Sequence, residues 1–292
     1  MRRLFPASHE TSDLDSRQWG LDELADVYAY PMDGPTDGPA AGSMAGSTGD
    51  LAGGPADRSR AEAGSESHRD RDTGWLRANM VSSLDGAAHH EGKSQPLSSD
   101  ADMRIFGTLR GLADAVVVGA QTVRQEGYRP ARAREAFAAR RAALGQPPAP
   151  VIAVVSASLD LDFGLPLFTE PLVPTIVLTG AGAAPDRVAA ARKAGAEVIV
   201  AGDSARVEPD RVKRVLAERG LTRLLTEGGP KMLGQFAAAG ALDELCLSLA
   251  PMVAAGAAPR IMNGPGLAVP ERFVLASVME EAGFLFTRYR RI

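Results

Sequence analysis

From residue 75 to the end of the chain, short apolar runs alternate with stretches in which apolar residues recur at helical spacing. The short runs are rich in β-branched residues, as strands are, and the longer stretches have the period of amphipathic helices. The pattern predicts strands at 76–81, 115–119, 151–156, 175–179, 197–200, 222–226, 244–250, 273–279 and 284–289. It predicts helices at 99–111, 132–143, 185–194, 208–219 and 230–239.

Strands that alternate with helices imply crossover connections and therefore a largely parallel sheet. The runs Val116–Val118 and Val151–Val155 are apolar on both faces, as strands covered on both sides are. Residues Glu280–Gly283 leave no room for a helix between the last two strands, which indicates an antiparallel hairpin. We therefore expect an α/β fold with a mostly parallel central sheet flanked by helices and an antiparallel C-terminal hairpin.

The first quarter of the chain has a different pattern. In residues 1–32, Leu21, Leu24, Val27 and Tyr28 have helical spacing, so we expect an N-terminal arm with a short helix near 21–29. Residues 33–73 hold eight glycines and three prolines but only two large apolar residues, Met44 and Leu51. Such a segment buries too little surface to offset its ordering entropy, so we expect a disordered linker, with the folded domain at 74–292.

Composition removes several classes of function. The 32 basic and 36 acidic residues give a net charge of −4, which argues against a protein that binds nucleic acid through a bulk positive charge. The single cysteine, Cys246, rules out a disulfide framework, a Cys-x-x-Cys pair and a cysteine-based zinc site. The four histidines lie outside any His-Glu-x-x-His pattern, so no metal site is expected.

No apolar run approaches the roughly 20 residues that a membrane-spanning helix needs. The first ten residues hold two arginines but no apolar stretch behind them, which is unlike a secretory signal. With one unpaired cysteine, these features favour a cytoplasmic protein that does not associate with membranes.

The segment 224–233 carries the clearest candidate chemistry. An apolar strand ends at Thr226, and Glu227, Gly228, Gly229 and Pro230 lead into the next predicted helix. Pro230 suits the first turn of a helix, and bare backbone at a helix N-terminus is suited to bind an anion. Glu227 lies at the carboxyl end of a strand, where open α/β sheets bind their ligands. A plain turn that uses glycine for positive φ explains the same pattern equally well.

Two further strands end in polar residues. Asp85 and Gly86 follow the first strand of the domain and are most simply a turn pair, although Ser82 and Asp85 could border a ligand. Thr122 follows the Val116–Val118 strand, where it caps a short helix or binds a ligand. Ser99, three residues before Asp102, is most simply a helix cap.

The turn after Thr179 nearly matches the dinucleotide fingerprint Gly-x-Gly-x-x-Gly. Pro185 replaces the third glycine, and Glu197 is too close to be the acidic residue that binds the ribose. A classical dinucleotide site is therefore not favoured here, although another kind of nucleotide-binding edge stays open.

Taken together, five motifs resemble the reductase domain family of riboflavin biosynthesis, the 5-amino-6-(5-phosphoribosylamino)uracil reductases. They occur in the family's order, and the resemblance covers about 75–290. The N-terminal LFP, the helix after it and YAYP at 28–31 also resemble the actinobacterial pyrimidine reductase branch. The motifs are NMVSSLDGA (79–87), GKSQPLSSDAD (92–102), FGTLRGLADAVVVGAQTVRQE (106–126), LLTEGGPKMLGQF (224–236) and LDELCLSLAP (242–251).

This resemblance implies a dihydrofolate-reductase-like fold, NADPH as hydride donor, a pyrimidine substrate and a homodimer. It implies substrate contacts at Ser94, Arg110 and Glu227. It implies cofactor contacts at Ser82, Thr122, Glu126, Gly228, Gly229, Pro230, Lys231, Met232 and Leu233, with Ser156, Ser158 and Thr179 near the adenosine end.

The chain departs from the bifunctional members of that family. Pro96 stands where an aromatic residue is usual after the Ser-Gln pair, and Glu126 stands where Asp is usual. The zinc ligands of the deaminase half are missing, which excludes deaminase activity. The two substitutions leave the exact pyrimidine open.

The implied reaction reduces a ribosylamine, as its ring-opened imine, to a ribitylamine. The imine nitrogen needs a proton as hydride arrives, and Asp85 and Glu126 are both candidate donors. Arg110 is either a partner for the substrate phosphate or an ordinary surface arginine. A reductase of another pteridine-like substrate, such as dihydrofolate, and a non-catalytic nucleotide-binding module are the alternative functions.

Overall fold

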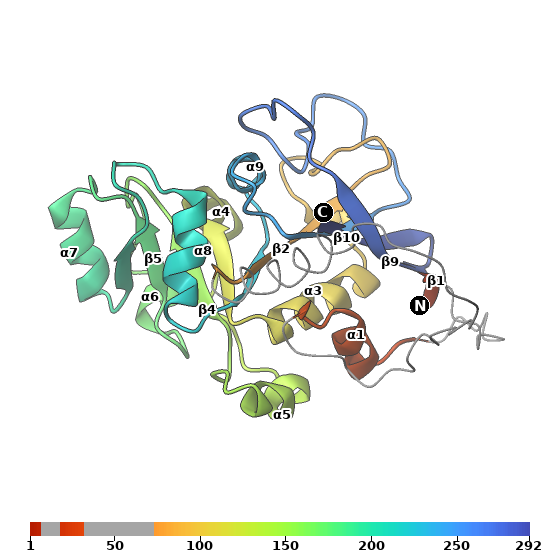
Figure 1. The fold of residues 1–292 in the computed structure, drawn as a ribbon, viewed down its shortest axis with the longest axis horizontal. Coiled ribbons are helices and arrows are strands. Elements are labelled where there is room, and N and C mark those ends of the chain that lie inside the picture. Colours follow the sequence, from red (N-terminus) through yellow and green to blue (C-terminus); the bar gives the residue numbers. More distant parts are fainter. Residues whose placement is uncertain (7–17, 32–72) are drawn as a thin grey trace, which may run out of the picture.

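The computed structural model describes residues 1–6, 18–31 and 73–292, and within them ten strands form one sheet (Figure 1). The strands are β1 (Arg2–Phe5), β2 (Trp75–Ser82), β3 (Ala115–Gly119), β4 (Val151–Val155), β5 (Ile176–Thr179), β6 (Glu197–Val200), β7 (Arg223–Thr226), β8 (Glu244–Leu249), β9 (Phe273–Glu281) and β10 (Phe284–Arg291). The helices are α1 (Leu21–Val27), α3 (Asp100–Leu112), α4 (Ala120–Glu126), α5 (Glu135–Ala143), α6 (Pro166–Thr169), α7 (Pro185–Lys193), α8 (Pro209–Ala217) and α9 (Pro230–Ala238), with a 3₁₀ turn at Gln95–Leu97.

The strand order is β1-β9-β10-β8-β2-β7-β3-β4-β5-β6. All neighbours from β8 to β6 are parallel, whereas β10, β9 and β1 add on antiparallel beyond β8. Ala282 and Gly283 join β9 to β10 with positive φ angles of 52° and 82°, which is the backbone of a two-residue type I′ turn. The predicted α/β fold and its C-terminal hairpin are confirmed.

The two faces of the sheet carry separate apolar layers. Val116 and Val118 of β3 face the layer of α1, α3, α5 and α7, whereas Val117 faces the layer of α8 and α9. Successive side chains of a strand point to opposite faces, so this three-valine run is buried on both sides. Burial on both faces explains why β3 and β4 are continuous apolar runs in the sequence.

Helix ends follow their local sequence. Pro185, Pro209 and Pro230 occupy the first turns of α7, α8 and α9. The Ser99 hydroxyl accepts a hydrogen bond from the Asp102 backbone N–H at 3.2 Å, so the prediction of a cap is confirmed. Thr122 caps nothing, because α4 begins at Ala120 after Gly119 and carries Thr122 inside it.

The N-terminal arm packs on the sheet of its own chain. The strand β1, which the sequence pattern did not reveal, pairs with β9, and α1 packs beside α3 (Figure 1). The helix near 21–29 is confirmed at Leu21–Val27. Nearly all of the expected linker 33–73 lies outside the described residues, so that expectation and the division into arm, linker and domain stay predictions.

A buried charge cluster ties the arm to the sheet. The Glu244 carboxylate on β8 accepts hydrogen bonds from Arg77 on β2 and Arg288 on β10, at 2.7 and 2.5 Å. The two guanidinium groups also donate to the backbone carbonyls of Val27, Tyr28 and Ala29. We call Arg77, Glu244 and Arg288 the arm cluster.

Across the described part of the chain, no helix is long and apolar enough to cross a membrane. The same residues hold no group of three or more histidine, cysteine or acidic side chains that could bind a metal ion.

Candidate active site

A cleft of about 1520 Å³ lies at the carboxyl ends of β2, β7, β3 and β4. It is lined along one side by Asn79 of β2 and Ser94, and along the other by Thr122 of α4, Ser156 and the N-terminus of α9. Parallel strands end at one edge of their sheet, which is where such folds bind ligands. Pockets for one small ligand are usually 300–1,000 Å³, so this cleft has room for two.

The turn between β7 and α9 forms one wall. Gly228 and Gly229 have φ angles of 96° and 69°, a backbone conformation that L side chains rarely adopt. A Cβ on Gly229 would lie 3.2 Å from the Thr122 Oγ1, so the turn approaches α4 closely. The cleft is lined by Gly229, Pro230, Lys231 and Met232. The two glycines therefore form a turn that needs positive φ, and the same turn lies at the wall of the cleft.

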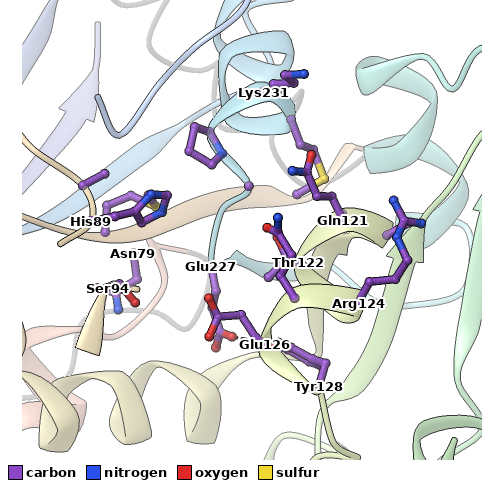
Figure 2. Close-up of a pocket in the computed structure, with 18 of the residues that line it drawn as sticks. Asn79, His89, Ser94, Gln121, Thr122, Arg124, Glu126, Tyr128, Glu227 and Lys231 are labelled. Carbon is purple, nitrogen blue, oxygen red and sulfur yellow. Dashed lines mark hydrogen bonds between the residues drawn. The ribbon is translucent and has the colours of Figure 1, made fainter. Parts of the chain in front are cut away.

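The Glu227 carboxylate is buried in the wall of the cleft. The Arg110 Nε donates to its Oε1 and the Arg110 Nη2 donates to its Oε2, both at 2.5 Å. The Tyr128 hydroxyl donates to Oε2 at 2.6 Å and accepts from Arg110 at 2.7 Å. The Glu227 side chain is only 6% exposed, and Figure 2 shows it among the residues that line the cleft. We call Arg110, Glu227 and Tyr128 the cleft cluster.

Burial and neighbouring charges keep both Tyr128 and Arg110 protonated. Burial, followed by the neighbouring Glu227 charge, raises the pKa of Tyr128 well above its ordinary value, so the phenol stays a hydrogen-bond donor. Burial alone would lower the pKa of Arg110, but the Glu227 carboxylate raises it above the ordinary value. Arg110 also stacks on Phe106, with its guanidinium 4.5 Å from the ring centroid. It is therefore a paired, largely covered side chain, and the alternative of an ordinary surface arginine is wrong.

Asp85 has a structural role at a turn. Its Oδ1 accepts from the Ser83 hydroxyl at 2.5 Å and from the Ala254 N–H, and its Oδ2 accepts from the Ala255 N–H at 2.7 Å. The Ser83 hydroxyl and then these backbone donors lower the pKa of Asp85 to about 2. A carboxyl with that pKa holds no proton to give near neutral pH, and Asp85 lies outside the cleft lining. The structure therefore supports the turn interpretation and does not support Asp85 as a proton donor, whereas Glu126 does line the cleft (Figure 2).

Of the other residues that the family resemblance places at the ligands, some line the cleft and others lie in the core. Ser94, Thr122, Ser156 and Ser158 line the cleft. Three residues lie behind the wall. The Ser82 hydroxyl donates to the Ser83 carbonyl, the Thr179 hydroxyl donates to the Ala157 carbonyl, and the Leu233 side chain is fully buried in the core.

Two residues that line the cleft each hold a buried side-chain oxygen without a hydrogen-bond partner among the described residues, the Asn79 Oδ1 and the Ser156 Oγ. Buried polar groups are nearly always hydrogen-bonded, so such atoms at a cleft wall are suited to meet a ligand. Together with the close turn at Gly229, they fit a dinucleotide and a second polar ligand.

Sequence reasoning gave no site role to five of the cleft residues that Figure 2 labels, Asn79, His89, Gln121, Arg124 and Tyr128. Asn79 lies inside a predicted strand rather than at its carboxyl end, so its position gave no signal of a binding role. Tyr128 follows a glycine in a loop, where an aromatic residue has no periodic signal, so only its contact with Glu227 reveals it.

Comparison with known proteins shows what the chain is similar to. A family model described as the RibD C-terminal domain matches residues 74–280. The 2,5-diamino-6-ribosylamino-4(3H)-pyrimidinone 5′-phosphate reductase of Methanothermobacter thermautotrophicus is 31% identical over 190 residues, which cover 65% of this chain and 83% of that protein. The riboflavin biosynthesis protein RibD of Bacillus amyloliquefaciens is 27% identical over 194 residues, covering 66% of this chain but 50% of that protein.

Among solved structures, a pyrimidine reductase-like protein of Corynebacterium diphtheriae has a TM-score of 0.67 and 29% identity. The match covers 76% of this chain and 94% of that one. The family match begins at Gly74, so the arm that carries β1 and α1 lies outside it. The chain belongs to the RibD C-terminal domain family.

Proposed function

We propose that the chain is an NADPH-dependent reductase that converts a phosphoribosylamino-pyrimidine to its ribitylamino form in riboflavin biosynthesis. The observation that carries the proposal is the Glu227 carboxylate beside the Gly228–Gly229 turn, in a cleft with room for two ligands. Relatives named as pyrimidinone phosphate reductases support it. A homodimer remains a prediction from the family resemblance, and a cytoplasmic location remains a prediction from the composition and the N-terminal sequence.

The cofactor would lie along the wall made by α4, β4 and α9. The backbone at Gly229 and the N-terminal turn of α9 would hold the pyrophosphate, because free N–H groups at a helix N-terminus favour an anion. Ser156 and Ser158 would meet the adenosine end, and the Thr122 hydroxyl would lie between the two. When bound, NADPH supplies the hydride, and this chain's residues bind it, orient it and exclude water.

The substrate would lie against β2 and β7. The Glu227 carboxylate is an acceptor suited to ring N–H and amino groups, and Asn79 and Ser94 flank the same region. The Arg110 fork is bonded to Glu227 and Tyr128, so its best-supported role is to hold Glu227 rather than to bind the phosphate directly. Glu126 is the remaining candidate for moving the proton to the imine nitrogen.

The test is NADPH oxidation with two pyrimidines, the 2,5-diamino-pyrimidinone phosphate and the deaminated uracil, with NADH as the matched cofactor control. We expect turnover with at least one pyrimidine and a preference for NADPH. Turnover at the background rate with both pyrimidines would contradict the proposal.

Two alternatives have distinct outcomes in the same assay. Reduction of dihydrofolate, or inhibition by folate analogues, would indicate a pteridine-like substrate. Tight NADPH binding without hydride loss to any pyrimidine, even in a single turnover, would indicate a non-catalytic binding module.

A further inference from the structure

The loop after α4 delivers an aromatic hydroxyl to Glu227. The helix α4 ends at Glu126, and Gly127 follows in the left-handed conformation at φ 57°. This turn lets the Tyr128 N–H donate back to the Val123 carbonyl at 3.3 Å. The Tyr128 ring is thereby directed across the cleft wall toward α3 and the end of β7.

The bonds to Glu227 are unevenly divided between its two oxygens. Oε2 accepts from both the Tyr128 hydroxyl and the Arg110 Nη2, whereas Oε1 accepts, among the residues that the structure describes, from the Arg110 Nε alone. A carboxylate oxygen has two lone-pair sites, so Oε2 is saturated by the protein and Oε1 keeps capacity for a ligand. Tyr128 thus determines which oxygen of Glu227 remains available.

Tyr128 also holds the Arg110 guanidinium in its position against Glu227. The Arg110 Nη2 donates to both the Glu227 Oε2 and the Tyr128 hydroxyl, and the Arg110 guanidinium lies 5.3 Å from the Tyr128 ring centroid. Charge-assisted and bidentate hydrogen bonds are short and directional, so this three-member arrangement has one favoured geometry.

We propose that Tyr128 is a positioning residue that fixes Glu227, together with Arg110, so that the Glu227 Oε1 receives an N–H group of the pyrimidine. The inference rests on the proposed function and deepens it. Tyr128 acts through Glu227 and touches neither the hydride-transferring atoms nor the cofactor. Burial raises the pKa of Tyr128, so the phenol keeps the proton that it donates to Glu227.

The central experiment is a double-mutant cycle of Tyr128→Phe and Glu227→Gln, read as KM and kcat for the pyrimidine. Tyr128→Phe keeps the ring and removes only the hydroxyl. We expect it to raise KM about tenfold, to change kcat less than threefold and to leave NADPH affinity unchanged. In the Glu227→Gln background the same substitution should have little further effect on KM, because residues that act as a unit are not additive.

Controls separate positioning from folding. Tyr289→Phe on β10, outside the cleft lining, should leave KM unchanged. The thermal midpoint and NADPH affinity of Tyr128→Phe report whether the fold is intact. If Tyr128→Phe fails to fold, Tyr128→Leu, which also removes the hydroxyl donor, takes its place in the cycle.

The outcomes are distinct. An unchanged KM in Tyr128→Phe, or effects of the two substitutions that add fully, overturns the positioning role while the reductase function stands. If wild type binds a pyrimidine in calorimetry but does not reduce it, the reductase proposal falls, and the cycle is read in the dissociation constant instead. If wild type neither binds nor reduces a pyrimidine, both proposals fall.

Discussion

The arm cluster and the cleft cluster are built from the same kinds of side chain, yet their surroundings differ. In the arm cluster, Glu244 is fully buried and accepts hydrogen bonds from two arginines and from the Trp75 indole. In the cleft cluster, Glu227 is bonded by one arginine and one tyrosine, and Arg110 keeps 21% of its side chain exposed.

The difference separates a carboxylate with a structural role from one that we propose binds the pyrimidine. The carboxylate of the arm cluster meets donors on both oxygens, and its two arginines also bond arm carbonyls, so nothing is left for a ligand. The cleft cluster has one oxygen with spare capacity, at the wall of a large cleft. A buried Arg–Glu pair alone therefore does not indicate a site, whereas an incompletely satisfied pair at a cleft does.

The largest expected effect comes from Glu244→Gln. It leaves Arg77 and Arg288 buried without their counter-ion, and breaking a buried pair in this way typically costs about 3–5 kcal/mol. We expect the free energy of unfolding in urea to fall by about that amount. NADPH affinity of the folded fraction should be unchanged. A loss of less than about 1 kcal/mol would mean that the arm cluster contributes little.

The stability of the protein at acid pH provides a second test of the structural role of Glu244. Burial alone would raise the pKa of Glu244, but Arg77 and Arg288 lower it from 4.5 to about 2. Its contribution to stability is therefore complete above pH 4.5 and is lost as the pH falls toward 2. We expect wild type to lose stability over that window and Glu244→Gln to have a flatter profile. Equal slopes in the two proteins would contradict the assignment.

A smaller energetic effect, on activity rather than stability, is expected from Glu227→Gln. Losing a hydrogen bond to a charged group costs about 1.5–3 kcal/mol, so kcat/KM for the pyrimidine should fall by about 10- to 150-fold. The free energy of unfolding should fall less than in Glu244→Gln, because Arg110 is partly exposed. The exposed Glu170 provides the control substitution Glu170→Gln. A larger loss of stability than in Glu244→Gln would reverse the comparison.

The smallest effect is expected from Gly229→Val, which crowds Thr122 and blocks backbone approach to a phosphate. NADPH affinity should weaken about tenfold, roughly 1.4 kcal/mol. Gly145→Val is a matched control, because Gly145 has a similar φ of 67° but open space around it and lies outside the cleft lining. Equal NADPH affinity in the two variants would show that the Gly229 turn does not hold phosphate.

Elements with a strong local pattern could be predicted from the sequence. The parallel strands β3 and β4 are continuous apolar runs, and α7, α8 and α9 begin at prolines. The short helix α4 was missed as an element because only Val123 of its seven residues is buried, which leaves no apolar period. The edge strand β1 was missed because all four of its residues are exposed.

The sequence could predict those residues of the candidate site that directly follow the end of a parallel strand. Glu227 and Gly229 stand directly after β7, and topology alone brings them to the ligand edge. The pairing of Arg110 with Glu227 joins residues 117 positions apart, and no local pattern encodes it. Asp85 also follows a strand, but the loop at Ala254–Ala255 binds it from outside the cleft.

The reactivity of the single cysteine, Cys246, reports whether the strands on either side of it are paired. Cys246 lies on β8, where Asn79 of β2 and Arg288 of β10 are its neighbours in register. Burial and the nearby Glu244 charge raise its pKa to about 12, so the thiol is unreactive while the strands stay paired. Its labelling rate in native buffer therefore measures the free energy of separating β8 from its neighbours, at the junction between the parallel and antiparallel halves.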